Sequence, residues 1–210
     1  MRIIGGAARG RPLEAPRGDA TRPTADRTRE SVFNILGNKL DIPMSEARVL
    51  DLFAGSGALG LEAISRGAPS AVLVDHDASA VAVMRKNLAA LGREAAGHPV
   101  RIVKDDAARA ITRLAEAGDR FDLCFLDPPY AAVAALAAAL DRLPAVLAPG
   151  AVVVVEYDRR TPPAAWPPGL SPEDVREYGD TRVAFLRAPS IEAPDAPDPP
   201  DTATEPGEAT

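Results

Sequence analysis

Apolar residues follow two spacing patterns that alternate along the chain. Short apolar runs, typical of strands buried on both faces, occupy residues 49–53, 71–75, 100–103, 121–126 and 151–156. Longer stretches with apolar residues at helical spacing lie between them, at residues 58–66, 79–91, 107–117 and 132–143. Strands that alternate with helices in this way predict βαβ units and a mostly parallel sheet flanked by helices.

Two further features complete this picture. Residues 27–40 place Val32, Phe33, Leu36 and Leu40 on one face, which predicts a helix ahead of the first strand. Near the end of the pattern, residues 175–178 and 182–186 predict a hairpin that turns at Gly179 and Asp180. The fold class expected is therefore α/β and Rossmann-like, with seven strands in a mostly parallel sheet and a small N-terminal extension.

Composition divides the chain into three parts. Residues 188–210 contain six acidic residues, six prolines and no Lys or Arg, so this tail cannot bury enough apolar surface to order itself. We expect residues 1–47 to form a basic arm and helix, residues 48–187 the main domain, and residues 188–210 a disordered tail. The 210 residues, 46% of them hydrophobic, suffice for one globular domain with a full core.

The net charge of −6 hides an uneven distribution. Without the tail, the chain carries 24 acidic and 24 basic residues, and residues 1–39 alone hold eight bases against four acids. An arginine-rich arm indicates phosphate contacts, although a solvated surface that merely carries Arg is the alternative. The candidates for RNA binding are Arg9, Arg11, Arg22, Arg27 and Arg29.

Several classes of protein are disfavoured. The lone Cys124 lies in an apolar run and allows no internal disulfide, and two histidines with one cysteine offer no credible zinc site. No apolar stretch approaches the roughly 20 residues that span a bilayer, and the N-terminus lacks the apolar core of a signal peptide. We expect a cytoplasmic monomer without a metal or a membrane partner.

A glycine-rich loop joins the first strand to the helix after it. Gly55, Gly57 and Gly60 match G-x-G-x-x-G in the strand–turn–helix setting that this motif requires, and Asp75 ends the next strand, where an acid can bind ribose hydroxyls. These features suit either NAD or S-adenosylmethionine, and Asp51 favours the latter because its carboxylate could meet the methionine ammonium. The expected cofactor-binding residues are Asp51, Phe53, Gly55, Ser56, Gly57, Asp75, Asp106 and Asp127. Asp106 follows the third strand and could accept the adenine amino group, cap a helix, or do both.

Asp127, Pro128, Pro129 and Tyr130 directly follow the strand predicted at residues 121–126. The Asp can accept a hydrogen bond from an exocyclic amine, the prolines fix the backbone and aim its carbonyls, and the Tyr ring can stack on a heterocycle. The combination suits methyl transfer to the amino nitrogen of a nucleobase, and we take these four residues as the catalytic set. A plain strand-ending turn is the alternative.

Together these motifs resemble the bacterial 16S ribosomal RNA guanine-N2 methyltransferases, the small-subunit methyltransferase D type of the class I S-adenosylmethionine-dependent enzymes. The resemblance covers residues 1 to about 187. It is carried by Arg2-Ile-Ile-Gly-Gly, Gly10-Arg-Pro-Leu, Thr21-Arg-Pro-Thr, Asp26-Arg-Thr-Arg-Glu, Phe33-Asn-Ile-Leu, the run from Asp51 to Glu62, Asn87-Leu88 and the Asp127 set. It implies methylation of one guanine amino group in 16S ribosomal RNA, within the small subunit or an assembly intermediate.

Three other functions fit parts of the chain. A DNA amino-methyltransferase would use the same four residues but would normally carry a sizeable target-recognition insertion. A non-catalytic RNA-binding assembly factor could keep the fold, although the intact glycines, Asp75 and Asp127 argue against decay. An NAD(P)-dependent oxidoreductase would leave the Asp127 set unexplained.

Overall fold

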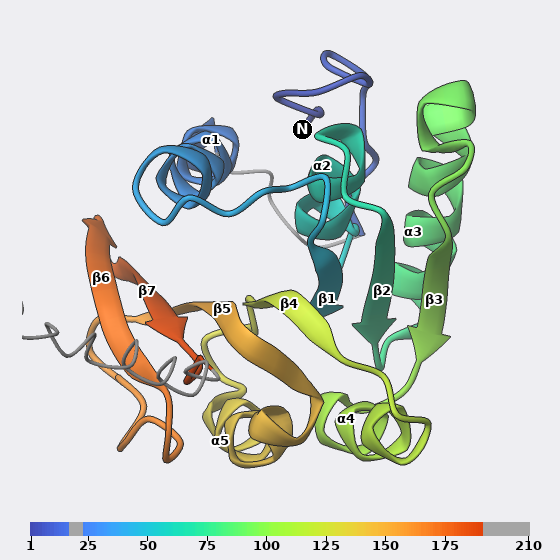
Figure 1. The fold of residues 1–210 in the computed structure, drawn as a ribbon. Helices are drawn as coiled ribbons and strands as arrows, with labels where there is room; N and C mark the ends of the chain where they lie inside the picture. Colours follow the sequence, from blue (N-terminus) through green and yellow to red (C-terminus); the bar gives the residue numbers. More distant parts are fainter. Residues whose placement is uncertain (17–22, 191–210) are drawn as a thin grey trace, which may run out of the picture.

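The computed structural model describes residues 1–16 and 23–190, and within them the chain forms a seven-stranded sheet in the order β3-β2-β1-β4-β5-β7-β6 (Figure 1). The first five strands are parallel, and β7 runs antiparallel to both β5 and β6. The strands are β1 (Arg48–Leu52), β2 (Ser70–Asp75), β3 (Val100–Lys104), β4 (Phe121–Leu126), β5 (Leu147–Asp158), β6 (Ser171–Tyr178) and β7 (Thr181–Arg187). The predicted mostly parallel, Rossmann-like sheet is confirmed.

Helices cover both faces of the sheet. The described helices are α1 (Pro23–Asn38), α2 (Ala58–Ser65), α3 (Ala78–Leu91), α4 (Ala107–Glu116) and α5 (Val133–Arg142), with short 3₁₀ turns η1 (Gly92–Ala95) and η2 (Leu143–Val146). In Figure 1, α1, α2 and α3 lie above the sheet, whereas α4 and α5 lie below it. Both layers follow from right-handed crossovers between parallel strands.

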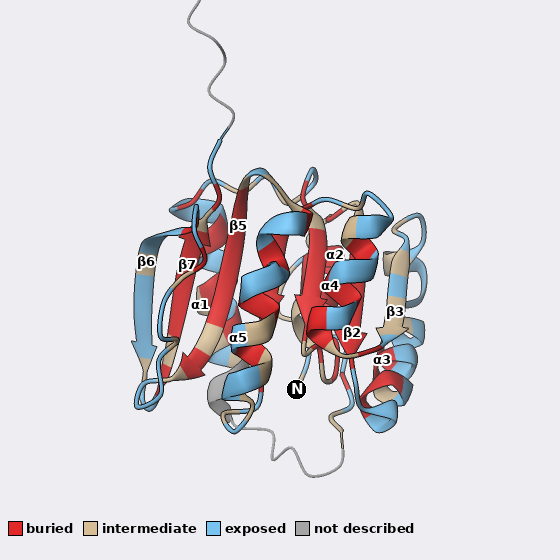
Figure 2. Ribbon diagram, turned by 90° about the horizontal axis from the view of Figure 1, so that it is seen from below, coloured by how far each residue is buried: buried red, intermediate tan, exposed pale blue. Residues whose placement is uncertain are grey.

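The apolar runs of the central strands supply two cores because alternate side chains point to opposite faces. On β4, Leu123 and Phe125 join the cluster under α1, α2 and α3, while Cys124 and Leu126 join the one under α4 and α5. Figure 2 shows the central strands buried, whereas the edge strands β3 and β6 are more exposed. Burial raises the pKa of the Cys124 thiol far above its ordinary value, in line with the expectation of a buried apolar residue.

The N-terminal arm packs onto α2 rather than standing apart. Glu62, which is fully buried, accepts hydrogen bonds from the backbone N–H groups of Ile4 and Gly5, both at 2.7 Å. Gly6 has a φ of 74°, and an added Cβ there would lie 1.8 Å from the Ser65 carbonyl oxygen, so only glycine allows this approach. Ile3 is buried in the same apolar cluster as Phe125 of the sheet.

The tail lies mostly outside the described residues. The expectation of disorder for residues 188–210 therefore concerns a segment of which only 188–190 are described. No helix in the described ranges is both long and apolar enough to cross a membrane.

Candidate active site

The strand order places two loops side by side at one edge of the sheet. The chain proceeds from β1 to β2 and β3 on one side, and then returns to place β4 against the other side of β1. Leu52 of β1 is level with Leu126 of β4, so the glycine loop and the Asp127 set leave the sheet as neighbours. This is the switch point, where open α/β sheets bind their ligands.

The glycine loop depends on backbone conformations that favour glycine. Gly57, the residue before α2, has a φ of 78°, and a Cβ at Gly60 would lie 2.2 Å from the side chain of Leu73 on β2. The third glycine therefore lets α2 pack closely against the sheet. Phe53 also has a positive φ, 62°, which is uncommon for a residue with a side chain and marks local strain at this loop.

Asp51 and Asp75 hold the loop from two adjacent strands. The buried Asp51 carboxylate accepts the Gly60 N–H at 2.9 Å, while Asp75 accepts the N–H groups of Gly55 at 2.9 Å and Asp77 at 2.8 Å. A carboxylate has about four acceptor sites, so Asp75 retains capacity for ribose hydroxyls. The expected roles of both acids fit this geometry, and both also have a structural role that the sequence did not indicate.

Burial raises the pKa of Asp51 from 3.8 to about 7, while the Gly60 N–H opposes the shift and the negative charges of Asp127 and Asp75 add to it. The three carboxylates therefore influence one another across the switch point. A concentration of negative charge at a glycine-rich turn fits a ligand with a positive charge, and S-adenosylmethionine carries a sulfonium and an ammonium group.

Ser56 is held by Asn87, a residue that belongs to the motifs of the family resemblance but to which the sequence analysis assigned no role. Its carbonyl accepts a hydrogen bond from the side-chain amide of Asn87 on α3, at 2.8 Å, and the same nitrogen donates to the Glu14 carbonyl at 2.9 Å. The Asn87 oxygen in turn accepts the Glu14 N–H at 2.8 Å. Asn87 thus ties the N-terminal arm to the glycine loop. The motif Asn87-Leu88 marked this position in the sequence, but it did not indicate the contact with Ser56.

At the end of β4, the four residues of the expected catalytic set differ in exposure. Asp127 and Pro129 are exposed, Tyr130 is half-buried and Pro128 is buried. The Pro129 carbonyl accepts the Ala132 N–H at 2.7 Å and starts the turn into α5. The Tyr130 hydroxyl is hydrogen-bonded to that of Thr181, the first residue of β7, which fixes where the ring lies. Thr181 carried no signal in the sequence because the contact spans 51 positions.

The two acidic residues after β3 have different roles. Asp106 caps α4, and one of its oxygens accepts the N–H groups of Ala108 at 3.0 Å and Arg109 at 3.2 Å. Asp105 is buried instead and forms ion pairs with Arg109 at 2.9 Å and Arg113 at 2.8 Å. The helix-capping alternative for Asp106 is therefore present, and contact with adenine through its other oxygen is compatible with it.

The basic arm is only partly available to RNA. Arg9, Arg11 and Arg27 are exposed, and Arg22 lies outside the described residues. The expectation for Arg29 was wrong, because its side chain is 5% exposed and lies 2.8 Å from Asp26 and 3.7 Å from Glu62, and it also donates to the Arg2 carbonyl. A guanidinium held between two carboxylates and a carbonyl supports the arm and cannot reach a phosphate.

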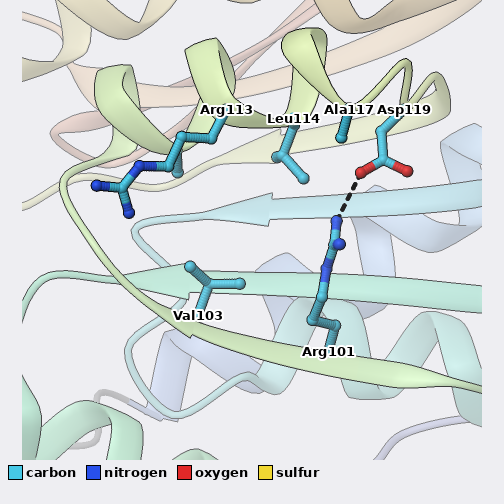
Figure 3. A pocket seen from close by; sticks show the side chains of 7 residues that line it. Arg101, Val103, Arg113, Leu114, Ala117 and Asp119 are labelled. Atoms are coloured by element: carbon cyan, nitrogen blue, oxygen red, sulfur yellow. Dashed lines mark hydrogen bonds and ion pairs between the residues drawn. The ribbon is translucent and has the colours of Figure 1, made fainter.

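A hollow of about 190 Å³ lies between β3 and α4, and none of the expected site residues lines it (Figure 3). Arg101 on its floor forms an ion pair with Asp119 at 2.7 Å. Among the described residues, no group of three or more His, Cys, Asp or Glu side chains could hold a metal ion.

Known proteins are similar to this chain along most of its length. The family model described as "Conserved hypothetical protein 95" matches residues 1–187. "Putative rRNA methyltransferase YlbH" of Bacillus subtilis is 38% identical over 189 residues, which cover 89% of this chain and 98% of that protein. "Ribosomal RNA small subunit methyltransferase D" of Escherichia coli K12 is 44% identical over 130 residues, 62% of this chain and 60% of that protein. The solved structure "Putative methyltransferase yhhF from Escherichia coli" is 34% identical, covers 91% of this chain and 99% of its own, and superposes with a TM-score of 0.73.

Proposed function

The chain belongs to the family described as conserved hypothetical protein 95, and we propose that it transfers a methyl group from S-adenosylmethionine to the exocyclic N2 of a guanine in 16S ribosomal RNA. The observation that carries this proposal is the position of the Asp127 set at the end of β4, beside the glycine loop at the switch point. The names of its relatives, which specify ribosomal RNA of the small subunit, support the substrate class.

S-adenosylmethionine, when bound, supplies an electrophilic methyl group on a sulfonium. Asp75 and the glycine loop would hold its ribose, while the negative charge of Asp51 and Asp127 would favour its cationic part. These residues fit the cofactor because the structure concentrates three carboxylates there and strains the backbone at Phe53 to form the turn. The loop is supported through Asn87, so it is shaped before the cofactor binds.

The guanine amino group is a poor nucleophile because its lone pair is delocalised into the ring. Asp127 is exposed at the strand end and can accept one N–H of this amino group, and the Pro128 carbonyl can accept the other. Both bonds would localise the lone pair and orient it toward the methyl group, so positioning and electrostatics supply most of the catalysis. Tyr130 would offer its ring to the base that has left its stack.

The arm adds the RNA contacts. Arg9 and Arg11 lie exposed on the segment whose Ile4 and Gly5 N–H groups bind Glu62. Arg27 lies exposed on α1, which is held to the same carboxylate through Arg29. Residues 1–47 would thereby act with the sheet domain of residues 48–187 on the same substrate. Arg22 belongs to this set by sequence and lies outside the described residues.

Asp127→Ala tests the proposal. We expect the variant to bind S-adenosylmethionine within a few-fold of the wild type and to lose methyl transfer by at least ~100-fold, the scale of one lost preorganised polar contact. Glu116→Ala, which removes an exposed acid from α4, is the control for a general change in charge. Methyl transfer is measured with protein-free 16S RNA and with small-subunit particles, followed by nucleoside analysis for N2-methylguanosine. Near-normal turnover of Asp127→Ala would remove this residue from the mechanism, and a different methylated nucleoside would refute the guanine-N2 assignment.

A further inference from the structure

A groove of about 320 Å³ lies next to the Asp127 set, on the side of α5. Pro128, Pro129 and Tyr130 form one end, the first turns of α5 form one wall, and residues 161–165 after β5 form the other. Neither the glycine loop nor Asp51, Asp75 or Asp127 lines it. The groove therefore adjoins the methyl-transfer centre and shares Pro128, Pro129 and Tyr130 with it, but it extends away from the three carboxylates along α5.

The lining of the groove suits a flat, uncharged ring. Two tyrosines, Tyr130 and Tyr157, and four prolines contribute to it, and Tyr157 is braced edge-on by Trp166 with the ring centroids 6.0 Å apart. Aromatic faces stack on any nucleobase, and proline rings add rigid apolar surface at little entropic cost.

The charges of the groove disfavour a phosphate as its occupant. No Lys or Arg belongs to the lining, whereas Asp141 and Asp158 do, and Asp158 is paired at 3.4 Å with Arg160, which is not in the lining. Carboxylates repel phosphate but accept hydrogen bonds from the amino groups on base edges. The groove therefore fits the base of a nucleotide and leaves its backbone outside.

The mouth of the groove is unusually apolar. In the described part of the chain, only two large apolar side chains are exposed, Val133 at 47% and Val175 at 45%, and Val133 lines the groove. An exposed apolar residue at the rim of a concave apolar site is typical of a binding surface.

We propose that this groove binds a second unstacked base of the RNA substrate, from a nucleotide that flanks the target guanine. The proposal rests on the proposed function, because the RNA must bring its target to Asp127. Since Tyr130 belongs both to the Asp127 set and to the groove, an RNA strand that delivers the target base passes directly beside the groove. The flanking base then gives the enzyme a contact with sequence context that Asp127 itself cannot provide.

Filling the groove at positions outside the Asp127 set tests the proposal. Ala137→Phe and Ala164→Phe place a ring in it, and Ala134→Phe adds the same ring to an exposed position of α5 outside the lining. We expect the two filling variants to bind S-adenosylmethionine like the wild type and to lose about tenfold or more in kcat/KM for the RNA substrate, the scale of one stacked base. Ala134→Phe should behave like the wild type.

A photo-cross-linking phenylalanine analogue at position 137 identifies the occupant. We expect a cross-link to a nucleotide within one or two positions of the methylated guanine. Kinetics of Ala137→Phe equal to those of Ala134→Phe would overturn the proposal, as would a cross-link to a ribosomal protein instead of RNA. If the wild type transfers no methyl group to ribosomal RNA, the proposed function itself fails, and that outcome is recognised before any variant is compared.

Discussion

The buried carboxyl of Asp51 couples cofactor binding to pH. Its pKa is raised to about 7, mainly by burial, and the charges of Asp127 and Asp75 contribute to the same shift. Near neutral pH this carboxyl is therefore about half protonated in the free protein. A ligand that brings positive charge to this cluster should lower the pKa again, so the binding of S-adenosylmethionine releases a proton from Asp51.

The size of the effect follows from linkage. With a pKa near 7 in the free protein and an ionised carboxyl in the complex, binding should release about half a proton at pH 7, and affinity should rise about tenfold between pH 6 and pH 8. The raised pKa has the opposite consequence for folding. Because the folded state holds the proton more tightly, the stabilising contribution of Asp51 is full below its ordinary pKa of 3.8 and is lost as pH rises through about 7.

Calorimetry in buffers of different ionisation enthalpy measures the proton release. The observed binding enthalpy should depend linearly on the buffer enthalpy, and the slope gives the number of protons. Asp51→Asn is the matched control because it keeps an acceptor for the Gly60 N–H and cannot titrate. The ligand's own ammonium group titrates near pH 8, so the comparison is repeated at pH 6, where this ammonium is almost fully charged and the released proton comes from Asp51. Equal slopes for the wild type and Asp51→Asn would refute the reasoning.

Three further predictions concern positioning, stability and RNA. Tyr130→Phe and Thr181→Val each remove one hydroxyl of a partly buried pair, and each should slow methyl transfer about tenfold, on the scale of ~1–2 kcal/mol for an unpaired partner. The double variant should be no slower, and additive losses would show that the pair does not act as a unit. Glu62→Gln should lower the free energy of unfolding, measured in urea, by about 3 kcal/mol or more, because the N–H groups of Ile4 and Gly5 and the Arg66 guanidinium lose a buried carboxylate. A loss below about 1 kcal/mol would contradict this role. Replacing Arg9 and Arg11 with Ala should reduce the salt dependence of RNA binding by up to about two units, with cofactor affinity unchanged; an unchanged slope would show that they are ordinary surface residues.

The central strands were predictable because they are buried on both faces. The strand predicted at residues 121–126 is β4 as the structure has it, since a run that is apolar at every position except Asp122 and lies between charged residues has only one good position in a parallel sheet. The hairpin was placed correctly, but β6 begins at Ser171 instead of residue 175. Its early residues are exposed and lie on an edge strand, so they carry no hydrophobic pattern.

The start of one central strand also differs from the prediction. The strand was predicted at residues 151–156, yet β5 runs from Leu147 to Asp158 and includes Pro149 and Gly150. The register explains this, because Phe121 pairs with Leu147 and Leu123 with Val152. The proline and glycine form an irregularity within the strand, where a residue without a ladder N–H is tolerated.

The candidate site was predictable where chemistry depends on local sequence and not where it depends on contacts across the fold. The glycine loop and the Asp127 set are short continuous motifs, and the parallel sheet brings them together. Asn87 and Glu62 belong to motifs of the family resemblance, but the contacts that join Asn87, Thr181 and Glu62 to the loop, to Tyr130 and to the arm span 31 or more positions, so local spacing does not reveal them. The family resemblance also rested on short local motifs. The match of the family model over residues 1–187 confirms it.

Arg29 shows why charge alone misleads in a basic arm. Arg27 and Arg29 stand two positions apart on the helix α1, and two positions turn a helical side chain through roughly 200°, to the opposite face. Arg27 consequently faces solvent, whereas Arg29 points toward the fully buried Glu62 on α2. A buried carboxylate needs a cation close by, and the helix phase decides which arginine supplies it. The positive charge available for RNA is therefore smaller than the number of arginines in the arm suggests. Its placement depends on how α1 lies against α2.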